Sequence, residues 1–551
     1  MKRVKTTVSF YTLGRFKGDV TVRLISENGS ELCSHRIDAG TGKAWKRHDA
    51  TLTPTDSDSR ARFVIELDGQ GTLLLDYVSL FPQETFRNRE NGLRRDVAET
   101  LEALHPAFIR WPGGGIVEGI TLSNRVKWKE TIGDPVKRPG QYNLWGYRST
   151  YGFGYHEFLQ FCEDIGADAM FVCNAGLGGQ AAVGDACPEE ELDLFIADAL
   201  DAIDYALGDG TTDWSRRRVE NGHPGPFPLK YVEIGNENWG CGGNMRPEYY
   251  ADVYKRYQTF CRNYSGNRLY RIACGSSSAD YNWTEVMMKN LDSNNVDAID
   301  LHYYTMPVWP EMESATDFDD ELYYKTIAAA NFSDELITRH SEIMNRYDPE
   351  KKIGLVIGEW GCWHKVEEGT NPGFLYQQNT MRDAIVAAIE LNVFNRHSDR
   401  VVMANLAQAV NVLQSVILTE GDKMIKTPTY HVFDLFKTHQ NNEAVYCYTQ
   451  NENMSEGKNA PMISVSASVN EKSMTVTAAN CSLAEEAAVE CSIFGFKASS
   501  VSCRILTNEA HSYNDFDCPD RVSITEHTAV IKDNVLKLNI PPCAVVECVV
   551  D

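Results

Sequence analysis

Seven short apolar runs that alternate with amphipathic stretches constrain the fold of this chain more than any other feature. Between residues 107 and 406 the apolar runs have the length and β-branched content of buried strands, and the segments between them repeat apolar residues at helical spacing. Repeated strand–helix units of this kind predict a (β/α)8 barrel of the TIM type, in the α/β class. The predicted strands are 107–110, 169–173, 230–234, 271–274, 298–302, 354–357 and 401–406.

The strand count stops one short of a closed barrel, which needs eight. A helical pattern over 93–104 precedes the first counted strand, so the eighth strand should lie upstream of it. Residues 72–78 are one candidate, and they are equally suited to be the last strand of a separate N-terminal sheet. We therefore expect a barrel whose first strand is either 72–78 or missing from this chain.

Strand-like alternation flanks the predicted barrel on both sides. Residues 1–82 alternate apolar and polar positions and carry hairpin-type turns at Asn28-Gly29 and Asp68-Gly69, which predicts part of a β-sandwich. Short strands separated by turn residues return after about residue 440 and predict a C-terminal β-sandwich. The expected domains are a partial sandwich over 1–82, a barrel over 83–437 and a sandwich over 438–551.

Charge and cysteine content exclude several classes of partner. Lys plus Arg is 53 and Asp plus Glu is 77, and the net charge of −24 argues against nucleic acid and anionic membranes. The 15 cysteines show no metal-ligand spacing, so we expect neither a metal site nor a disulfide framework. No apolar run is long enough for a signal peptide or a membrane span, which predicts a cytoplasmic protein. Secretion or a periplasmic location is the alternative if a preceding segment carried a signal.

Two glutamates follow predicted strands at equivalent positions. Glu237 follows strand 230–234 within the stretch Gly-Asn-Glu-Asn, and Glu359 follows strand 354–357. The C-terminal ends of barrel strands meet at one rim, so we expect both carboxyls to face the same cleft. A structural ion pair is the alternative for each, but the repeated placement favours catalysis. Two facing carboxyls are the minimum set for glycoside hydrolysis.

Other polar and aromatic side chains fall on the same predicted rim. Arg110 is either a buried partner of a carboxylate or the group that stabilises an ionised nucleophile, and these two roles nearly coincide. His302 is equally compatible with a buried core histidine and with a neighbour of the catalytic pair. Amides, cations and aromatic rings together are typical of a sugar site. The candidate binding residues are Arg110, Asn174, Asn236, His302, Tyr304, Trp363 and Gln408.

A set of motifs resembles the α-L-arabinofuranosidases of glycoside hydrolase family 51. The motifs run in the family's order over nearly the whole barrel, and this ordered set is much more specific than Gly-Asn-Glu, which many retaining barrel glycosidases carry. The C-terminal stretch Pro-Pro-Cys-Ala-Val-Val at 541–546 also resembles the family's closing strand. The matching stretches are 110–114 (Arg-Trp-Pro-Gly-Gly), 154–167, 235–237 (Gly-Asn-Glu), 300–304 (Asp-Leu-His-Tyr-Tyr), 358–360 (Gly-Glu-Trp), 371–383, 404–414 and 427–433.

The resemblance implies a retaining, exo-acting enzyme that releases terminal α-L-arabinofuranosyl groups from arabinose-containing oligosaccharides and polysaccharides of hemicellulose. It implies no metal and no organic cofactor, and because family members are often oligomeric, a homo-oligomer is compatible with it. Glu237 matches the family's general acid/base and Glu359 its nucleophile. The other matches are Asn236 to the contact with the sugar 2-hydroxyl, Arg110 and Tyr304 to neighbours of the nucleophile, His302 and Gln408 to the lining of the sugar pocket, and Trp363 to an aromatic at its mouth.

The chain departs from the family pattern at two places. Gly115 stands where family members often carry Asn or Cys, which predicts the loss of one sugar contact. The family's first barrel strand and its sugar-touching glutamate come from a segment ahead of a carbohydrate-binding-like sandwich, and residues 1–82 match only the later part of that sandwich. The alternatives are therefore another retaining barrel glycosidase, such as a β-xylosidase or endoglucanase, and a shortened homologue that binds sugar without turnover.

Overall fold

The computed structural model describes residues 5–38, 42–179, 185–240, 244–261, 263–310, 312–450 and 461–551. The chain divides into two compact units. The smaller unit contains Met1–Ala103 together with Thr419–Met424, and the larger contains Leu104–Leu418 together with Ile425–Asp551. Each unit is described by itself.

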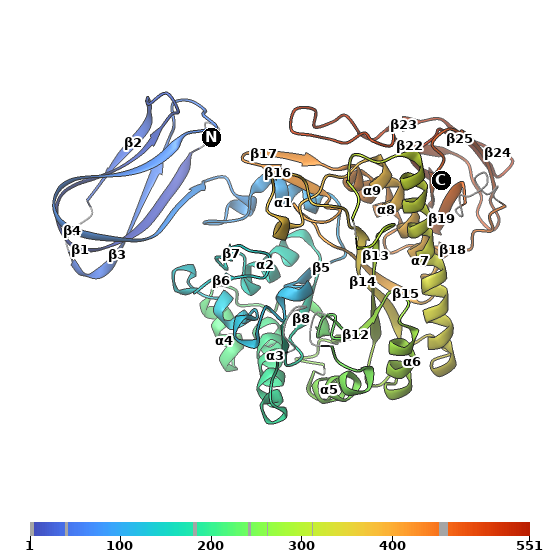
Figure 1. Ribbon diagram of the computed structural model, residues 1–551, viewed down its shortest axis with the longest axis horizontal. Coiled ribbons are helices and arrows are strands. Elements are labelled where there is room, and N and C mark those ends of the chain that lie inside the picture. The colour runs from blue at the N-terminus through green and yellow to red at the C-terminus, as the bar shows by residue number, and fades with distance from the viewer. Residues whose placement is uncertain are drawn as a thin grey trace. The chain divides into compact units, whose positions relative to one another are not determined.

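The smaller unit is built on one antiparallel sheet with two very long strands, drawn in blue in Figure 1. β1 (Thr6–Ile25) pairs along nearly its whole length with β4 (Arg62–Pro82), and its other edge pairs with β3 (Gly42–Leu52) and then β2 (Glu31–Ile37). Buried side chains from both halves of β1, such as Val8 and Val22, belong to one core cluster, as expected for a small sandwich. Helix α1 (Arg95–Glu102) follows the sheet.

The larger unit contains the predicted parallel barrel sheet. Each of its seven strands falls on one of the seven predicted runs, so the α/β barrel prediction is confirmed. The carboxyl ends of all seven strands point the same way because every neighbouring pair is parallel. In sheet order the strands are β15 (Val401–Leu406), β14 (Gly354–Cys362), β13 (Ala298–Thr305), β12 (Tyr270–Ser277), β11 (Leu229–Ile234), β8 (Asp168–Cys173) and β5 (Phe108–Trp111).

The structure decides between the two assignments of residues 72–78. These residues lie inside β4, where Thr72 pairs with Arg15 and Asp76 with Tyr11 of β1, so they belong to the N-terminal sheet. Within the described residues, β5 and β15 are the two ends of the barrel sheet and no strand joins them.

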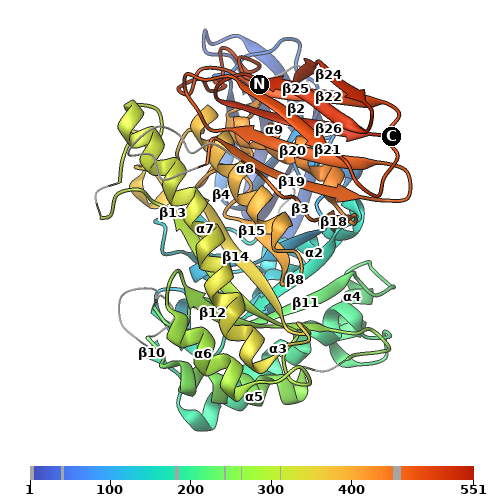
Figure 2. The ribbon, with the colours of Figure 1, turned by 90° about the vertical axis from the view of Figure 1, so that its right-hand side faces the viewer.

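Helices cover the outer face of the barrel sheet (Figures 1 and 2). Some of them begin with a side-chain cap: the Asp319 carboxylate accepts the backbone N–H of Leu322 at 2.8 Å at the start of α7. None of the described helices is both long enough and apolar enough to cross a membrane. The helices are α2 (Tyr155–Ile165), α3 (Leu192–Leu207), α4 (Asp213–Glu220), α5 (Pro247–Phe260), α6 (Tyr281–Asn290), α7 (Asp320–Tyr347), α8 (Met381–Arg396) and α9 (Pro428–Phe436).

The C-terminal part forms two antiparallel sheets, and the larger one packs against α8 (Figure 2). Asn392 of α8 joins the helix to this sandwich, because its amide oxygen accepts hydrogen bonds from the hydroxyls of Ser466 at 2.7 Å and Thr477 at 2.8 Å. One sheet contains β18 (Glu443–Val445), β19 (Ile463–Val469), β20 (Met474–Asn480), β26 (Ala544–Val550), β22 (Val501–Thr507) and β23 (Thr525–His527), and the other contains β21 (Ala487–Ser492), β25 (Val535–Ile540) and β24 (Ala529–Lys532).

The described residues also form three short hairpins in loops. Hairpin β6–β7 lies in the long loop between β5 and α2, and hairpin β9–β10 lies in the loop after β8. Their bounds, with those of the third hairpin, are β6 (Gln141–Tyr142), β7 (Arg148–Ser149), β9 (Leu177–Gly178), β10 (Asp185–Ala186), β16 (Ile417–Glu420) and β17 (Lys423–Lys426).

Candidate active site

Two carboxyls and one imidazole meet at the carboxyl ends of the barrel strands. The Nδ1 atom of His302 lies 2.9 Å from Oε1 of Glu237 and 3.7 Å from Oε2 of Glu359. A carboxylate oxygen of Glu237 and one of Glu359 are within 4.8 Å of each other. Both glutamate side chains are about one eighth exposed (13% and 12%), so solvent still reaches them.

The strands extend further than the sequence pattern predicted. His302 was predicted as the last residue of its strand and Glu359 to lie just beyond its strand, but β13 continues to Thr305 and β14 to Cys362. The two residues are paired neighbours in the sheet. Strand pairing therefore holds both side chains, which is more rigid than a loop.

Gly358 makes this pairing possible. Leu301 pairs with Ile357, but the next residue of β13, His302, pairs with Glu359, so Gly358 is an extra residue on β14. Such a bulge turns the following side chain toward a new direction and is common next to active sites. A Cβ atom at position 358 would lie 2.0 Å from the Asp300 carboxylate, so only glycine fits there.

Glu237 lies in a tight turn after β11. Its own φ is 45°, in the left-handed region that side chains other than glycine rarely adopt. The backbone N–H of Gly240 bonds back to the Glu237 carbonyl at 3.0 Å and closes the turn. Backbone strain of roughly 1–3 kcal/mol is typical of residues held for function rather than for stability.

Glu359 is held by two donors. Nη1 of Arg110 lies 3.1 Å from its Oε1, and the Tyr304 hydroxyl donates to its Oε2 at 2.5 Å. Burial raises the pKa of Tyr304 well above its usual range, and the nearby Glu359 charge adds to the rise. Tyr304 is therefore a proton donor to Glu359 and not an anion at neutral pH.

Arg110 connects three residues of the site. Its Nε donates to Glu233 at 2.8 Å and its Nη2 to the amide oxygen of Asn236 at 2.8 Å, in addition to the bond to Glu359. Burial alone lowers the pKa of Arg110, but attraction to Glu233 and Glu359 outweighs it and the pKa is raised. Because Arg110 binds the oxygen of Asn236, the buried Nδ2 of that amide points elsewhere and has no partner among the described residues.

Two buried acids close to Glu237 and Glu359 were not predicted from the sequence. Glu233 was assigned to a buried strand without a role, yet it is fully buried on β11 against Arg110. Asp300 was quoted only as part of a motif, and its Oδ2 lies 2.8 Å from Nε2 of His302. The available signal was an acid inside an otherwise apolar strand, which is rare without a buried partner.

A third overlooked acid, Glu118, comes from the loop after β5. Its side chain is fully buried, and neither carboxylate oxygen bonds to another described residue. Burial raises the pKa of Glu118 well above its usual range, and the neighbouring Glu237 adds to the rise. Glu118 is therefore expected to be a neutral carboxylic acid at pH 7.

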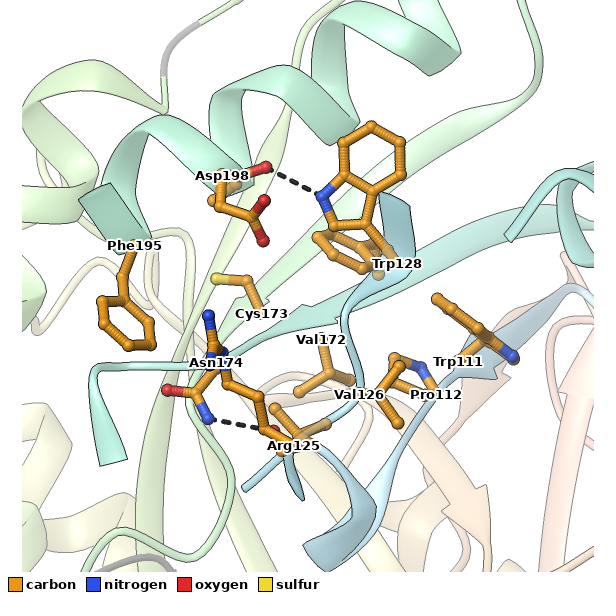
Figure 3. Close-up of a pocket in the computed structure, with 13 residues that line it drawn as sticks. Trp111, Pro112, Arg125, Val126, Trp128, Val172, Cys173, Asn174, Phe195 and Asp198 are labelled. Atoms are coloured by element: carbon orange, nitrogen blue, oxygen red, sulfur yellow. Dashed lines mark hydrogen bonds between the residues drawn. The ribbon is translucent and has the colours of Figure 1, made fainter. Parts of the chain in front are cut away.

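Asn174 lines a pocket next to the barrel, shown in Figure 3 together with Arg125, Trp128 and Phe195. Its Nδ2 donates to the carbonyls of Val117 at 2.9 Å and Leu177 at 2.6 Å, and its Oδ1 accepts the backbone N–H of Leu177. The amide thus ties the loop after β5 to the loop after β8. Its predicted sugar contact stays a prediction.

The remaining candidates lie around the rim. Trp363 packs edge-on against Tyr304 with ring centroids 5.1 Å apart, and its side chain is half-buried. Gln408 is exposed just beyond β15. Gly115 is buried in the turn after β5, and a Cβ on its neighbour Gly114 would stand 3.5 Å from Oε1 of Glu359.

Two groups of carboxylates and imidazole bring their ligand atoms within 4.8 Å, the spacing of a metal site. In both groups, however, the nitrogens of His302 face carboxylates as their partners, and the Arg110 guanidinium supplies positive charge. Protonated nitrogen thus fills the place that a divalent cation would take. We interpret the groups Glu237–His302–Glu359 and Glu233–Asp300–His302 as acid–base networks.

Comparison with known proteins places this chain in a family. The model of the α-L-arabinofuranosidase 1 domain matches residues 100–322, and that of the α-L-arabinofuranosidase C-terminal domain matches residues 358–544. An intracellular exo-α-L-arabinofuranosidase of Bacteroides ovatus is 38% identical over 463 residues, which are 83% of this chain and 86% of the relative.

Solved structures agree with the family models. The arabinofuranosidase of glycoside hydrolase family 51 from Xanthomonas axonopodis pv. citri has a TM-score of 0.76 and 37% identity, covering 85% of this chain and 92% of its own. The α-L-arabinofuranosidase of Thermotoga maritima, solved with arabinose, has a TM-score of 0.69 and 25% identity, covering 84% and 90%. The chain therefore belongs to the α-L-arabinofuranosidases of glycoside hydrolase family 51, and it is a glycosidase that releases arabinose.

Proposed function

We propose that the chain removes terminal α-L-arabinofuranosyl groups by a retaining double displacement, with Glu359 as the nucleophile and Glu237 as the general acid/base. The short gap between the two carboxyls, with a pair of oxygens within 4.8 Å, carries this proposal. Retaining glycosidases hold these groups about 5–5.5 Å apart, whereas inverting enzymes leave roughly 6.5–9.5 Å for a water molecule.

In the first step, an oxygen of ionised Glu359 attacks the anomeric carbon while the bond from that carbon to the leaving oxygen breaks. Glu237 gives its proton to the leaving oxygen, and the sugar stays bonded to Glu359. In the second step, Glu237 takes a proton from water, the water oxygen bonds to the anomeric carbon, and Glu359 is released as a carboxylate. Arg110 and Tyr304 stabilise the negative charge of Glu359 before the first step and after the second.

The proposed sugar contacts are polar and aromatic groups around this pair. Nδ2 of Asn236 is the best supported, because Arg110 fixes the orientation of the amide and leaves this buried donor free for a sugar hydroxyl. An unsatisfied buried donor costs roughly 1–3 kcal/mol, so a sugar oxygen at this position would be bound with a matching gain. The other proposed binding residues are Arg110, Asn174, His302, Tyr304, Trp363 and Gln408.

The proposed substrates are arabinose-containing oligosaccharides and hemicelluloses. The word exo in the name of the Bacteroides ovatus relative supports action on terminal groups. That relative is also named as intracellular, which supports the proposed cytoplasmic location, and fractionation of cells that carry the native gene tests it. A homo-oligomer is proposed as well, and light scattering on the purified chain tests it.

Hydrolysis of an aryl α-L-arabinofuranoside tests the proposed mechanism. The parent chain should release arabinose and should leave the matching aryl β-xyloside largely uncut. Glu359→Ala and Glu237→Ala should each lose most of this activity, while Glu335→Ala, which changes a half-exposed glutamate on α7, should keep it. Transfer to methanol followed by NMR should give the methyl α-L-arabinofuranoside. The β product, or full activity in Glu359→Ala, would refute the proposal.

A further inference from the structure

Asp300, His302 and Glu237 form a chain of three titratable groups that runs from the middle of β13 to the turn after β11. Oδ2 of Asp300 lies 2.8 Å from Nε2 of His302, and Nδ1 of the same ring lies 2.9 Å from Oε1 of Glu237. Asp300 and His302 are 2% and 4% exposed, so water cannot replace either partner. The inference below rests on the proposed role of Glu237 as the general acid/base.

The Asp300 carboxylate has no freedom to turn away from His302. Its Oδ1 accepts the backbone N–H of Leu301 at 2.7 Å. The missing side chain of Gly358 makes room for the carboxylate, since a Cβ there would overlap with it. The bulge at Gly358 thus leaves room for the Asp300 carboxylate. This carboxylate places a negative charge beside Nε2 of His302.

A negative charge at this position selects the hydrogen arrangement of His302. The Nε2–H bond does not point straight at Oδ2, so the contact acts mainly through charge. At 2.8 Å a carboxylate still repels a bare nitrogen lone pair and attracts an N–H, which favours a hydrogen on Nε2. Nδ1 then meets Glu237 in one of two ways: as acceptor from a protonated carboxyl, or as donor to a carboxylate.

We propose that Asp300 is a positioning residue, which keeps a hydrogen on Nε2 of His302 so that Nδ1 and Glu237 hold one shared proton between them. That proton is the one delivered to the leaving oxygen in the first step. His302 keeps its Nε2 hydrogen throughout, and Asp300 stays ionised and exchanges no proton.

The charges around the ring agree with this role. Burial alone lowers the pKa of His302, but attraction to Asp300 and Glu359 outweighs it and raises the pKa well above its usual range. Burial alone raises the pKa of Asp300, but the His302 charge outweighs it and the net pKa is lowered. Burial raises the pKa of Glu233 to about 7 against the pull of Arg110, so this neighbour is partly protonated near neutrality.

The other titratable groups near the ring do not take over the role of Asp300. Tyr304 donates to Glu359, and Glu118 is held neutral by burial. Burial likewise raises the pKa of the Cys274 thiol, which lies on β12 beside Asp300, well above its usual range. Among the described residues, Asp300 is thus the ionised group placed at Nε2 of His302.

Asp300→Asn changes the hydrogen arrangement and little else. The amide keeps the size of the carboxylate and can still accept the Leu301 N–H, but its NH₂ group would face Nε2 and favour a bare nitrogen there. The ring hydrogen would then move to Nδ1 and hold Glu237 as a carboxylate, as loss of the orienting acid does in other acid–histidine pairs. Glu237 would reach the first step without its proton.

The test compares kcat/KM for two substrates across pH. Hydrolysis of an arabinofuranosyl disaccharide needs its leaving oxygen protonated, whereas a dinitrophenyl arabinofuranoside departs without that help. General acid catalysis contributes roughly 10²–10⁴-fold, so we expect Asp300→Asn to lose about 10²-fold or more on the disaccharide and less than about 5-fold on the dinitrophenyl substrate. The basic limb of the disaccharide profile should shift to lower pH.

Equal losses of kcat/KM on both substrates, with no shift of either limb of the pH profile, would overturn the proposal. A merely structural aspartate would give that result. Asp383→Asn is the matched control: Asp383 is also fully buried and also pairs with a histidine, His364, at 2.7 Å. Asp383→Asn should lower the melting temperature. It should change kcat/KM equally for the two substrates and should not shift either limb of the pH profile.

A second measurement is made on the parent protein and does not depend on an Asp300 variant. Nitrogen-15 NMR of histidine-labelled protein, with His302→Gln for assignment, should find the His302 ring protonated at Nε2. A neutral ring with its hydrogen on Nδ1 would overturn the proposal. If the parent has no arabinofuranosidase activity, the proposed function fails, but the NMR result still decides the role of Asp300.

Discussion

At the scale of single residues, Arg110 organises the site through its planar shape. Its three guanidinium nitrogens each bind a different partner: the buried acid Glu233, the amide of Asn236 and the proposed nucleophile Glu359. A lysine carries the same charge on a single atom and cannot span these partners. The sequence predicted that Arg110 binds one carboxylate, but not that it binds two.

Arg110→Lys should therefore reduce activity even though the charge is conserved. A hydrogen bond to a charged group contributes roughly 1.5–3 kcal/mol, so each lost bond should lower kcat/KM about 10- to 100-fold. The measurement is kcat/KM on an aryl arabinofuranoside together with the melting temperature. Activity within twofold of the parent would mean that charge alone is sufficient.

Glu390 of α8 predicts a pH dependence of stability. Its buried carboxyl accepts one hydrogen bond, from Thr305 at 2.7 Å, and burial raises its pKa from 4.5 to about 8. The folded state thus keeps a proton that the unfolded state loses above pH 4.5. This acid's contribution is fully present below pH 4.5 and declines until about pH 8.

Glu390→Gln removes that titration. The difference in melting temperature between variant and parent should move in favour of the variant as pH rises from about 4.5 to 8, and should be constant below that window. Thermal unfolding at several pH values measures it. A difference that does not change with pH would mean that Glu390 is ionised in the folded protein.

At the scale of elements, the strands were predicted at the right places but with the wrong ends. The seven apolar runs were found because burial on both faces of a parallel strand gives continuous apolar sequence. The apolar pattern ends where polar residues begin, so β13 was predicted to end at His302 and β14 before Glu359, whereas the two strands end at Thr305 and Cys362. The ends of these strands carry the polar residues of the site, so the apolar pattern does not reveal where the strands end.

Gly358→Ala tests the bulge as an element. The added methyl would stand 2.0 Å from the Asp300 carboxylate, and overpacking of this kind costs roughly 1–3 kcal/mol. We expect a lower melting temperature and a loss of kcat/KM, as Asp300 and Glu359 are displaced. Gly225→Ala is the control, since its nearest contact would be 4.0 Å away. Equal melting temperatures and equal kcat/KM values in both variants would show that the bulge has no special role.

At the scale of the whole molecule, the barrel and the C-terminal sandwich form one compact unit. Helix α8 is buried on nearly every side because it packs between the barrel sheet and strands β19 and β20. The Tyr323 hydroxyl of α7 donates to the Cys481 carbonyl at 3.1 Å across the same boundary. The predicted domain limits at 82 and 437 stay predictions. Residues on both sides of 437 belong to the same compact unit.

Val546→Ala tests whether the two parts unfold together. Val546 is 1% exposed in the core of the sandwich, and removing its methyl groups should cost about 2–3 kcal/mol. All ten tryptophans lie outside residues 438–551, so tryptophan fluorescence does not report on the sandwich itself. We expect the fluorescence transition to shift to lower temperature with the variant.

The control for this experiment is Val530→Ala, which changes a sandwich valine that is 54% exposed and should leave the transition in place. A fluorescence transition unchanged by Val546→Ala would show that barrel and sandwich unfold independently.

The sequence by itself determined the architecture and the family and predicted the pair of glutamates, because these depend on periodicity and on motifs that are local in the chain. Tertiary structure alone decided which buried acids stand beside that pair. Glu118, Glu233 and Asp300 come from three separate segments, and their distances follow from strand register and from one bulge. It also decided that residues 72–78 complete the N-terminal sheet, since an alternating strand pairs equally well with either sheet until its neighbours are known.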